Sequence, residues 1–127
     1  GEQILSFIKD DSVIVNKRLH DIWMATKINK KPINRMVSIP RLEINLSENK
    51  IFGNDGCNDF TASIKTATKA DLEFNAIALT ERMCVKVGVE DEFNKAMNAV
   101  KGYELEGLNL ILTDSHGNEV LSFLKVD

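Results

Sequence analysis

The chain has 127 residues, of which 43% are apolar and 28% are charged, a balance typical of a single globular domain with one core. Its formal net charge of −3 argues against a protein that binds nucleic acid or anionic membranes, because either partner requires a concentrated basic surface. No apolar run approaches the roughly 18 residues that a membrane-spanning helix needs.

Residues 1–18 are expected to form an N-terminal extension, either extra strands or a linker. Two apolar runs within it, Ile4–Ile8 and Ser12–Val15, are typical of short strands. The chain starts with Gly1 in place of Met, which is typical of a trimmed N-terminus. The lack of a visible signal peptide therefore argues for no particular location.

Residues 19–127 are expected to form one domain made mainly of half-buried antiparallel strands, because apolar and polar residues alternate in short runs. The predicted strands are 22–28, 41–46, 50–53, 60–64, 72–76, 103–106, 108–112 and 120–126. The residues expected to share a buried face in three of them are Leu42, Ile44 and Leu46; Phe60, Ala62 and Ile64; and Leu72, Phe74 and Ala76. Turn sequences rich in Asn, Asp, Gly and Pro separate the runs.

One segment has the period of an α-helix instead. Its apolar stripe consists of Val89, Phe93, Ala96, Met97 and Val100. The acidic run 90–92 lies in the expected first turn, and Lys101 followed by Gly102 is expected to close the helix, as dipole and C-cap preferences predict.

Many short strands and one helix predict a mainly β fold. We expect a small, strongly bent antiparallel sheet or a β-barrel-like domain, with the amphipathic helix packed on it through its apolar stripe.

Two short segments carry the only two cysteines: Gly53-Asn54-Asp55-Gly56-Cys57-Asn58-Asp59-Phe60 and Thr80-Glu81-Arg82-Met83-Cys84. The glycines at 53 and 56 indicate a sharp turn or a close approach between backbones. Upstream of them lie Leu19-His20-Asp21-Ile22-Trp23, Ile28-Asn29 and Pro40-x-Leu42. In this order the motifs resemble those of the META domain family, which includes the HslJ-like heat-shock proteins of bacteria.

The resemblance covers residues from about Leu19 to Phe123 and implies a β-barrel-like fold. The family is linked with heat shock, motility and secretion, without an established general activity. Many members are lipoproteins or carry secretory signals, so the resemblance also implies the periplasm or outer membrane, with tethering through a lipid anchor outside this chain. The residues at family-motif positions are Trp23, Gly53, Gly56, Cys57, Asn58, Phe60, Thr80, Arg82, Met83 and Cys84.

Cys57 and Cys84 are too far apart in sequence for a redox C-x-x-C pair, and two cysteines alone do not make a zinc site. His20 and His116 would complete a set of four ligands only if distant elements converged, so we expect no metal. Because the resemblance places both cysteines in family motifs that flank the same strands, we expect their Cα atoms to lie less than about 7 Å apart. A disulfide and a pair of buried, reduced thiols both remain open, and the envelope location implied by the resemblance favours the disulfide.

The polar loop 54–59 offers many oxygen atoms, but it lacks the alternating acid order and the distal glutamate of a calcium loop, so we interpret it as a turn. We expect Asn58 to hydrogen-bond the backbone of a neighbouring loop and Trp23 to pack in the core. Arg82 has two interpretations. It either pairs with an acid or caps carbonyls, or it helps to form a binding rim for a ligand or partner.

Catalysis finds no support in the sequence. Asp114, Ser115 and His116 are consecutive in a predicted turn, so their side chains diverge and cannot form a hydrolase relay. No motif places a nucleophile beside His20 and Asp21, and no phosphate-binding glycine loop is present. We therefore expect neither an enzyme nor a cofactor.

The expected function is that of a non-enzymatic protein of the cell envelope, an interaction module in stress tolerance or secretion with an unknown protein partner. The alternative is a carrier that holds a small apolar ligand or lipid inside the barrel. The interior distinguishes the two, because a carrier needs an apolar cavity of a few hundred Å³ where an interaction module has packed side chains.

Overall fold

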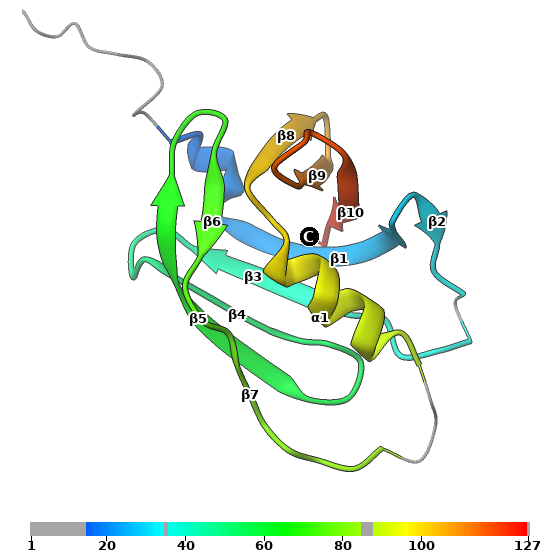
Figure 1. Ribbon diagram of the computed structural model, residues 1–127. Coiled ribbons are helices and arrows are strands. Elements are labelled where there is room, and N and C mark those ends of the chain that lie inside the picture. Colours follow the sequence, from blue (N-terminus) through cyan, green and yellow to red (C-terminus); the bar gives the residue numbers. More distant parts are fainter. Residues whose placement is uncertain (1–14, 35, 85–87, 127) are drawn as a thin grey trace, which may run out of the picture.

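The computed structural model describes residues 15–34, 36–84 and 88–126, which form a mainly β fold with one α-helix (Figure 1). The strands are β1 (Asp21–Ile28), β2 (Lys31–Pro32), β3 (Arg41–Asn45), β4 (Lys50–Asn54), β5 (Asp59–Ala67), β6 (Leu72–Phe74), β7 (Ala78–Leu79), β8 (Gly102–Glu106), β9 (Asn109–Thr113) and β10 (Glu119–Lys125). A short 3-10 helix, η2 (Lys17–Leu19), precedes β1, and helix α1 (Glu90–Asn98) lies between β7 and β8. The predicted strand at 4–8 and most of that at 12–15 lie outside the described residues.

The strands form one antiparallel sheet that curls until its two ends meet (Figure 1). Their order is β6-β5-β4-β3-β1-β10-β9-β8, and the short strands β2 and β7 pair with β1 and β5. The two ends touch through a bridge between Asp71 and Gly102. Beside this bridge, the N–H of Leu72 donates to the carbonyl of Lys101 at 3.1 Å. The result is a nearly closed barrel with one helix, which confirms the predicted fold class.

The inside of the barrel is filled with side chains, because alternate residues of each strand point inward. The largest fully buried ones are Trp23, Phe93, Phe123, Leu19, Leu42, Ile44, Ile51, Leu72, Met97, Leu110, Leu112 and Leu121. Trp23 is 2% exposed, and its Nε1 donates to the carbonyl of Leu19 at 3.1 Å. The burial of this indole with its polar group satisfied confirms that Trp23 is a core residue.

Helix α1 packs on the sheet through the predicted stripe. Phe93, Ala96, Met97 and Val100 are all buried, and Val89 is half-buried at the start of the helix. The ring of Phe93 lies 5.8 Å from that of Phe60 and 6.3 Å from that of Phe123, measured between centroids. One helical side chain therefore contacts both β5 and β10.

Two local predictions were wrong. Ala76 was expected on the buried face of a strand 72–76, but β6 ends at Phe74 and Ala76 is exposed. The regular alternation of buried and exposed side chains stops at Asn75, whose N–H donates to the carbonyl of Ser63. Gly102 does not close the helix, which ends at Asn98; it begins β8 instead. The chain has already joined the sheet at this point, since the N–H of Lys101 donates to a carbonyl of β9.

Gly53 allows β4 to approach its neighbours closely, as its position in the motif indicates. A Cβ atom at this residue would lie 2.2 Å from the carbonyl oxygen of Arg41 and 2.4 Å from the ring of Phe60. Gly56 is needed for a different reason, because its φ of +104° is rarely adopted by other residues. Both glycines therefore shape the loop that carries Cys57.

Replacing Phe93 by alanine should destabilise the domain by about 3–5 kcal/mol, because it removes a fully buried ring and both aromatic contacts. Urea unfolding of the variant and the wild type measures the loss. Lys95→Ala, on the exposed side of the same helix, is the matched control and should change stability by less than about 0.5 kcal/mol. Equal midpoints for Phe93→Ala and the wild type would contradict the packing of α1 on the sheet.

Candidate functional site

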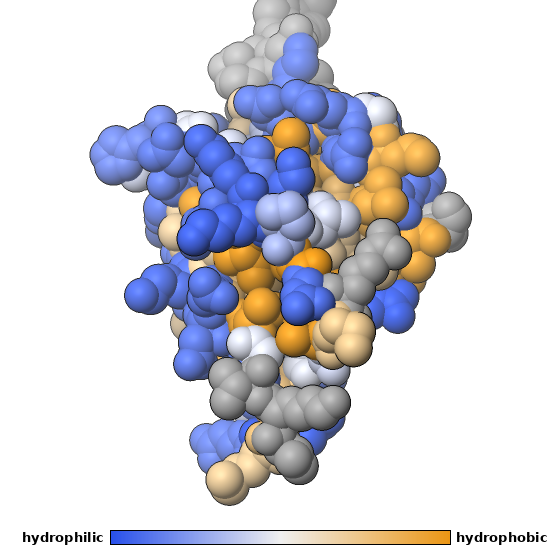
Figure 2. All heavy atoms as spheres, turned by 90° about the vertical axis from the view of Figure 1, so that its right-hand side faces the viewer, coloured by the Kyte–Doolittle hydropathy of each residue, from blue (hydrophilic) through white to orange (hydrophobic). Residues whose placement is uncertain are grey.

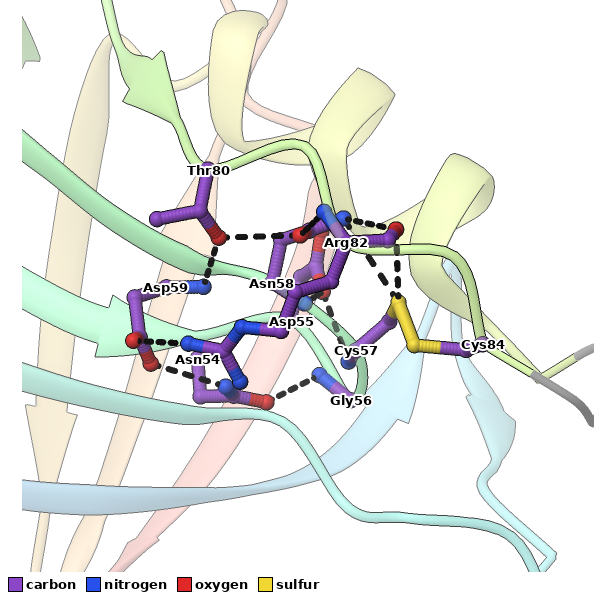
Figure 3. Close-up of polar contacts among 9 residues, drawn as sticks. All are labelled: Asn54, Asp55, Gly56, Cys57, Asn58, Asp59, Thr80, Arg82 and Cys84. Carbon is purple, nitrogen blue, oxygen red and sulfur yellow. Dashed lines mark hydrogen bonds and ion pairs between the residues drawn. A yellow bond between two sulfur atoms is a disulfide. The ribbon is translucent and has the colours of Figure 1, made fainter.

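The two cysteine segments meet at the end of β5. Cys57 and Cys84 form a disulfide with their Cα atoms 5.9 Å apart, which confirms the predicted proximity and decides between the bonded and the reduced pair. The pairing of β5 with β7, in which Phe60 lies opposite Leu79, brings the two segments together. We call residues 54–59 and 80–84 the disulfide-linked loops (Figure 3).

Asn58 joins the two disulfide-linked loops by hydrogen bonds. Its Oδ1 accepts from the backbone N–H of Arg82 at 2.6 Å and from the hydroxyl of Thr80 at 2.9 Å, as Figure 3 shows. Its Nδ2 donates to the carbonyl of Arg82 at 3.4 Å. The Thr80 hydroxyl in turn accepts from the N–H of Asp59 at 3.0 Å. These bonds confirm that Asn58 binds the backbone of a neighbouring loop.

Arg82 pairs with Asp59, in agreement with the first of its two interpretations. Both side chains are more than half exposed, so the pair contributes little to stability in water. Asn54 also donates to the carboxylate of Asp59, at 3.0 Å. The Asn54 hydrogen bond, followed by the charge of Arg82, holds the pKa of Asp59 below its ordinary value.

Asp55 is the site residue that the sequence analysis missed. It is 1% exposed, and its Oδ1 accepts the backbone N–H groups of Cys57 at 2.8 Å and Asn58 at 2.6 Å. Its Oδ2 accepts from Nδ2 of Asn94 at 2.7 Å, which ties the loop to helix α1. The bonds to the N–H groups of Cys57 and Asn58 form an Asx turn, which an Asp in a turn sequence predicts. The contact with Asn94 depends on the fold and could not be predicted in this way.

The histidines lie away from the disulfide. His20 Nδ1 accepts from the N–H of Leu46 at 2.9 Å, and His116 lies in the turn between β9 and β10. In that turn the Asp114 carboxylate accepts from the N–H groups of His116 and Asn118, and these bonds lower the pKa of Asp114. Asp114 therefore shapes the turn. Among the described residues, no group of three or more His, Cys, Asp or Glu side chains is placed to hold a metal ion.

Two open hollows flank strand β7 at Leu79. The first, which we call the outer groove, has a volume of about 560 Å³ and is lined by Phe52, Gly53, Asp59, Phe60, Thr61, Ala78, Leu79 and Thr80. The other measures about 320 Å³ and is lined by Asp55, Cys57, Asn58, Leu79, Cys84, Glu90, Asp91 and Asn94. Arg82 and Met83 line neither, although Met83 is 98% exposed. The first hollow is mainly apolar, and the second combines three carboxyl groups with no basic side chain.

In the part of the chain that the structure describes, neither helix is long and apolar enough to span a membrane.

Replacing both cysteines by serine should destabilise the domain by about 3–4 kcal/mol, since the bond closes a loop of 27 residues and restricts the unfolded chain. Urea unfolding without reductant measures the difference. Reductant should produce a similar loss in the wild type and none in the double variant. Reaction of both cysteines with a thiol reagent in the oxidised, folded protein would contradict the disulfide.

Asp55→Ala should cost about 3 kcal/mol, because two backbone N–H groups and the Asn94 amide would lose their buried acceptor. The same unfolding assay measures this cost. Asp59→Ala removes an exposed carboxyl group of the same loop and should have a much smaller effect. Similar losses in the two variants would show that burial of Asp55 is unimportant.

Solved structures share this fold. One, determined by NMR, has a TM-score of 0.66 at 21% identity and covers 88% of this chain and 96% of that one. An NMR structure of a protein from Burkholderia xenovorans has a TM-score of 0.65 at 18% identity, covering 89% of this chain and 90% of the other. The crystal structure of a duf4847 family protein from Bacteroides vulgatus ATCC 8482 has a TM-score of 0.61 at 13% identity, with 86% and 96% covered. At these identities the likeness establishes the fold alone.

No curated protein is significantly similar to the chain in sequence. The META domain family, in contrast, matches residues 17–127. This match includes Trp23 and both disulfide-linked loops, and it extends over nearly the whole chain. The chain belongs to the META domain family.

Proposed function

We propose that this META domain is a non-enzymatic interaction module of the cell envelope that binds another protein. The observation that carries the proposal is the filled interior of the barrel. Trp23 and Phe123 occupy it together with the inward-facing leucines and isoleucines of the strands, and each of the two rings is 2% exposed or less. A carrier needs that space for its ligand, so the packing favours binding on the outside.

Apolar side chains that are exposed on the outer surface support the same proposal. On the outer face of β1 and β10, Met24 lies opposite Leu124, and they are 39% and 36% exposed. Ile22 and Val126 are adjacent to them and are 42% and 41% exposed. Figure 2 shows hydrophobic side chains at the surface among hydrophilic ones. Clustered exposed apolar residues are typical of proteins that bind partners.

The disulfide supports an envelope location. Structural disulfides persist in oxidising compartments such as the bacterial periplasm and are rare in the cytosol. Together with the family, the Cys57–Cys84 bond favours the periplasm or the outer membrane. Because Cys84 is exposed, oxidants and reductants of the surrounding compartment can reach the disulfide directly.

The absence of activity is part of the proposal. Nucleophilic catalysis needs a nucleophile, a base and a charge-stabilising donor within reach of one another. Of the two histidines, His20 accepts a backbone hydrogen bond beside β3 and His116 lies in a turn next to Asp114. Neither lies in the two hollows beside β7. His20 lines another hollow, of about 460 Å³, together with Ser47, but its Nδ1 already accepts the N–H of Leu46.

The test is capture of an envelope protein by the tagged domain from unheated and heat-stressed cells of the native organism. We expect at least one protein to be retained saturably and to be displaced by an excess of untagged domain. The less stable, untagged Phe93→Ala domain is the control, and any displacement by it should scale with the fraction of it that unfolding measurements show to be folded. If no protein is displaced, and the domain purified from its native envelope instead releases a stoichiometric lipid on solvent extraction, the carrier function is correct.

A further inference from the structure

The outer edge of strand β7 lacks a neighbouring strand among the described residues. β7 pairs with β5 on one side only. Next to it, the N–H of Thr80 donates to the carbonyl of Asp59 at 3.0 Å. Backbone groups of successive residues in an antiparallel ladder point alternately to opposite sides, so the N–H and C=O of Leu79 point away from β5. They are available to pair with another strand.

This edge lacks the features that protect sheet edges against pairing. Natural edge strands commonly carry lysine, proline or inward-pointing charges, because an unpaired, apolar edge attracts other strands. The other short edge strand, β2, consists of Lys31 and Pro32 and follows this rule. The run 75–80, in contrast, contains no charged residue and no proline. Its exposed residues include Ala78 and Leu79.

The edge is held in an extended form by the disulfide-linked loops. Asn58 binds the backbone N–H of Arg82 and the hydroxyl of Thr80, directly after β7. The bond between Cys57 and Cys84 fixes the same segment four residues further on, as Figure 3 shows. A strand that docks here meets a preformed edge, so less conformational entropy is lost on binding.

The two hollows beside Leu79 indicate the chemistry of the docking strand. Successive side chains of a strand point to opposite faces of the sheet. A strand paired with β7 would direct one set of side chains toward the apolar groove of Phe52 and Ala78. It would direct the other set toward the hollow that is lined by Glu90 and Asp91. The carboxyl group of Asp91 has no ion pair or hydrogen bond with the described residues, and a basic side chain would complement it.

We propose that the β7 edge, residues 75–80, binds an extended protein segment in which apolar and basic residues alternate. The segment adds a strand to the sheet beside β7, with main-chain hydrogen bonds to Leu79. Its apolar side chains lie in the outer groove, and its basic side chains face Glu90 and Asp91. The inference rests on the proposed interaction function and names the chemistry of the partner.

The test uses a synthetic peptide of alternating valine and lysine, with binding to the domain measured by fluorescence anisotropy. Two further peptides carry N-methyl groups on one or the other alternate set of amides. Only one edge of the peptide faces β7, so one N-methylated peptide should lose roughly tenfold or more in affinity while the other binds as before. Equal binding of the two would overturn strand addition, and equal binding of a valine–glutamate peptide would overturn the charge assignment.

Variants of the domain locate the site. Leu79→Lys places a charge at the edge and should weaken peptide binding, as should Asp91→Asn. Met83→Lys, at a fully exposed residue of the same segment, is the matched control and should leave binding unchanged. Hydrogen exchange at the Leu79 amide should slow when the peptide binds. Equal binding by Leu79→Lys and Met83→Lys would overturn the proposed location.

The test separates this inference from the proposed function. Weak peptide binding, together with saturable capture of an envelope protein by the same preparation, would overturn the β7 site alone. Peptide binding that shows the N-methyl pattern supports the β7 site, even if no envelope protein is displaced. A concentration-dependent dimer of the free domain in sedimentation that Leu79→Lys abolishes would identify a second copy of the chain as the occupant and overturn the peptide partner.

Discussion

The structure depends on the contact of one helical ring with two separate strands. Phe93 is completely buried, and it meets Phe60 of β5 and Phe123 of β10, which are separated in the sheet by β4, β3 and β1. The two ends of the curled sheet meet at the bridge between Asp71 and Gly102, beside which the N–H groups of Leu72 and Tyr103 donate to carbonyls of the opposite end. Because α1 packs against strands from both parts of the sheet, it adds side-chain packing to the backbone pairing that holds the sheet curled.

The helix and the disulfide act on the same loop from opposite sides. Asp55 binds Asn94 of α1, while Cys57, two residues later, is bonded to Cys84 beyond β7. The loop between β4 and β5 is thereby fixed relative to both elements. The side chains of residues 80–84 are exposed, so apolar burial does not hold this segment in place. Polar and covalent bonds hold it instead. The same bonds present the β7 edge in an extended form.

Because the inside of the barrel is filled with side chains, we expect a binding site on its surface. Lipocalin-like barrels hold ligands because their interior exceeds the volume of their side chains. Here the inward residues include a tryptophan, two phenylalanines and many leucines, and two of the hollows on the outside lie beside Leu79. A small domain with this arrangement can offer a strand edge and grooves for alternate side chains, which is a common mode of peptide recognition.

The sequence by itself determined the longer strands and the helix, because those choices depend on local periodicity: Leu42 and Ile44 alternate, while Phe93 and Met97 follow helical spacing. The two-residue strands β2 and β7 are too short to show such a period. Its motifs also predicted the family and the proximity of Cys57 and Cys84. Only the tertiary structure decided that Gly102 begins β8, that the carboxyl group of Asp55 binds Asn94, and that no other strand of the described residues pairs with the outer edge of β7. Each of these depends on strand order and register, which join residues distant in the chain. Local periodicity contains no information about such contacts, since the hydrogen bond between residues 55 and 94 depends on how α1 packs beside the loop between β4 and β5.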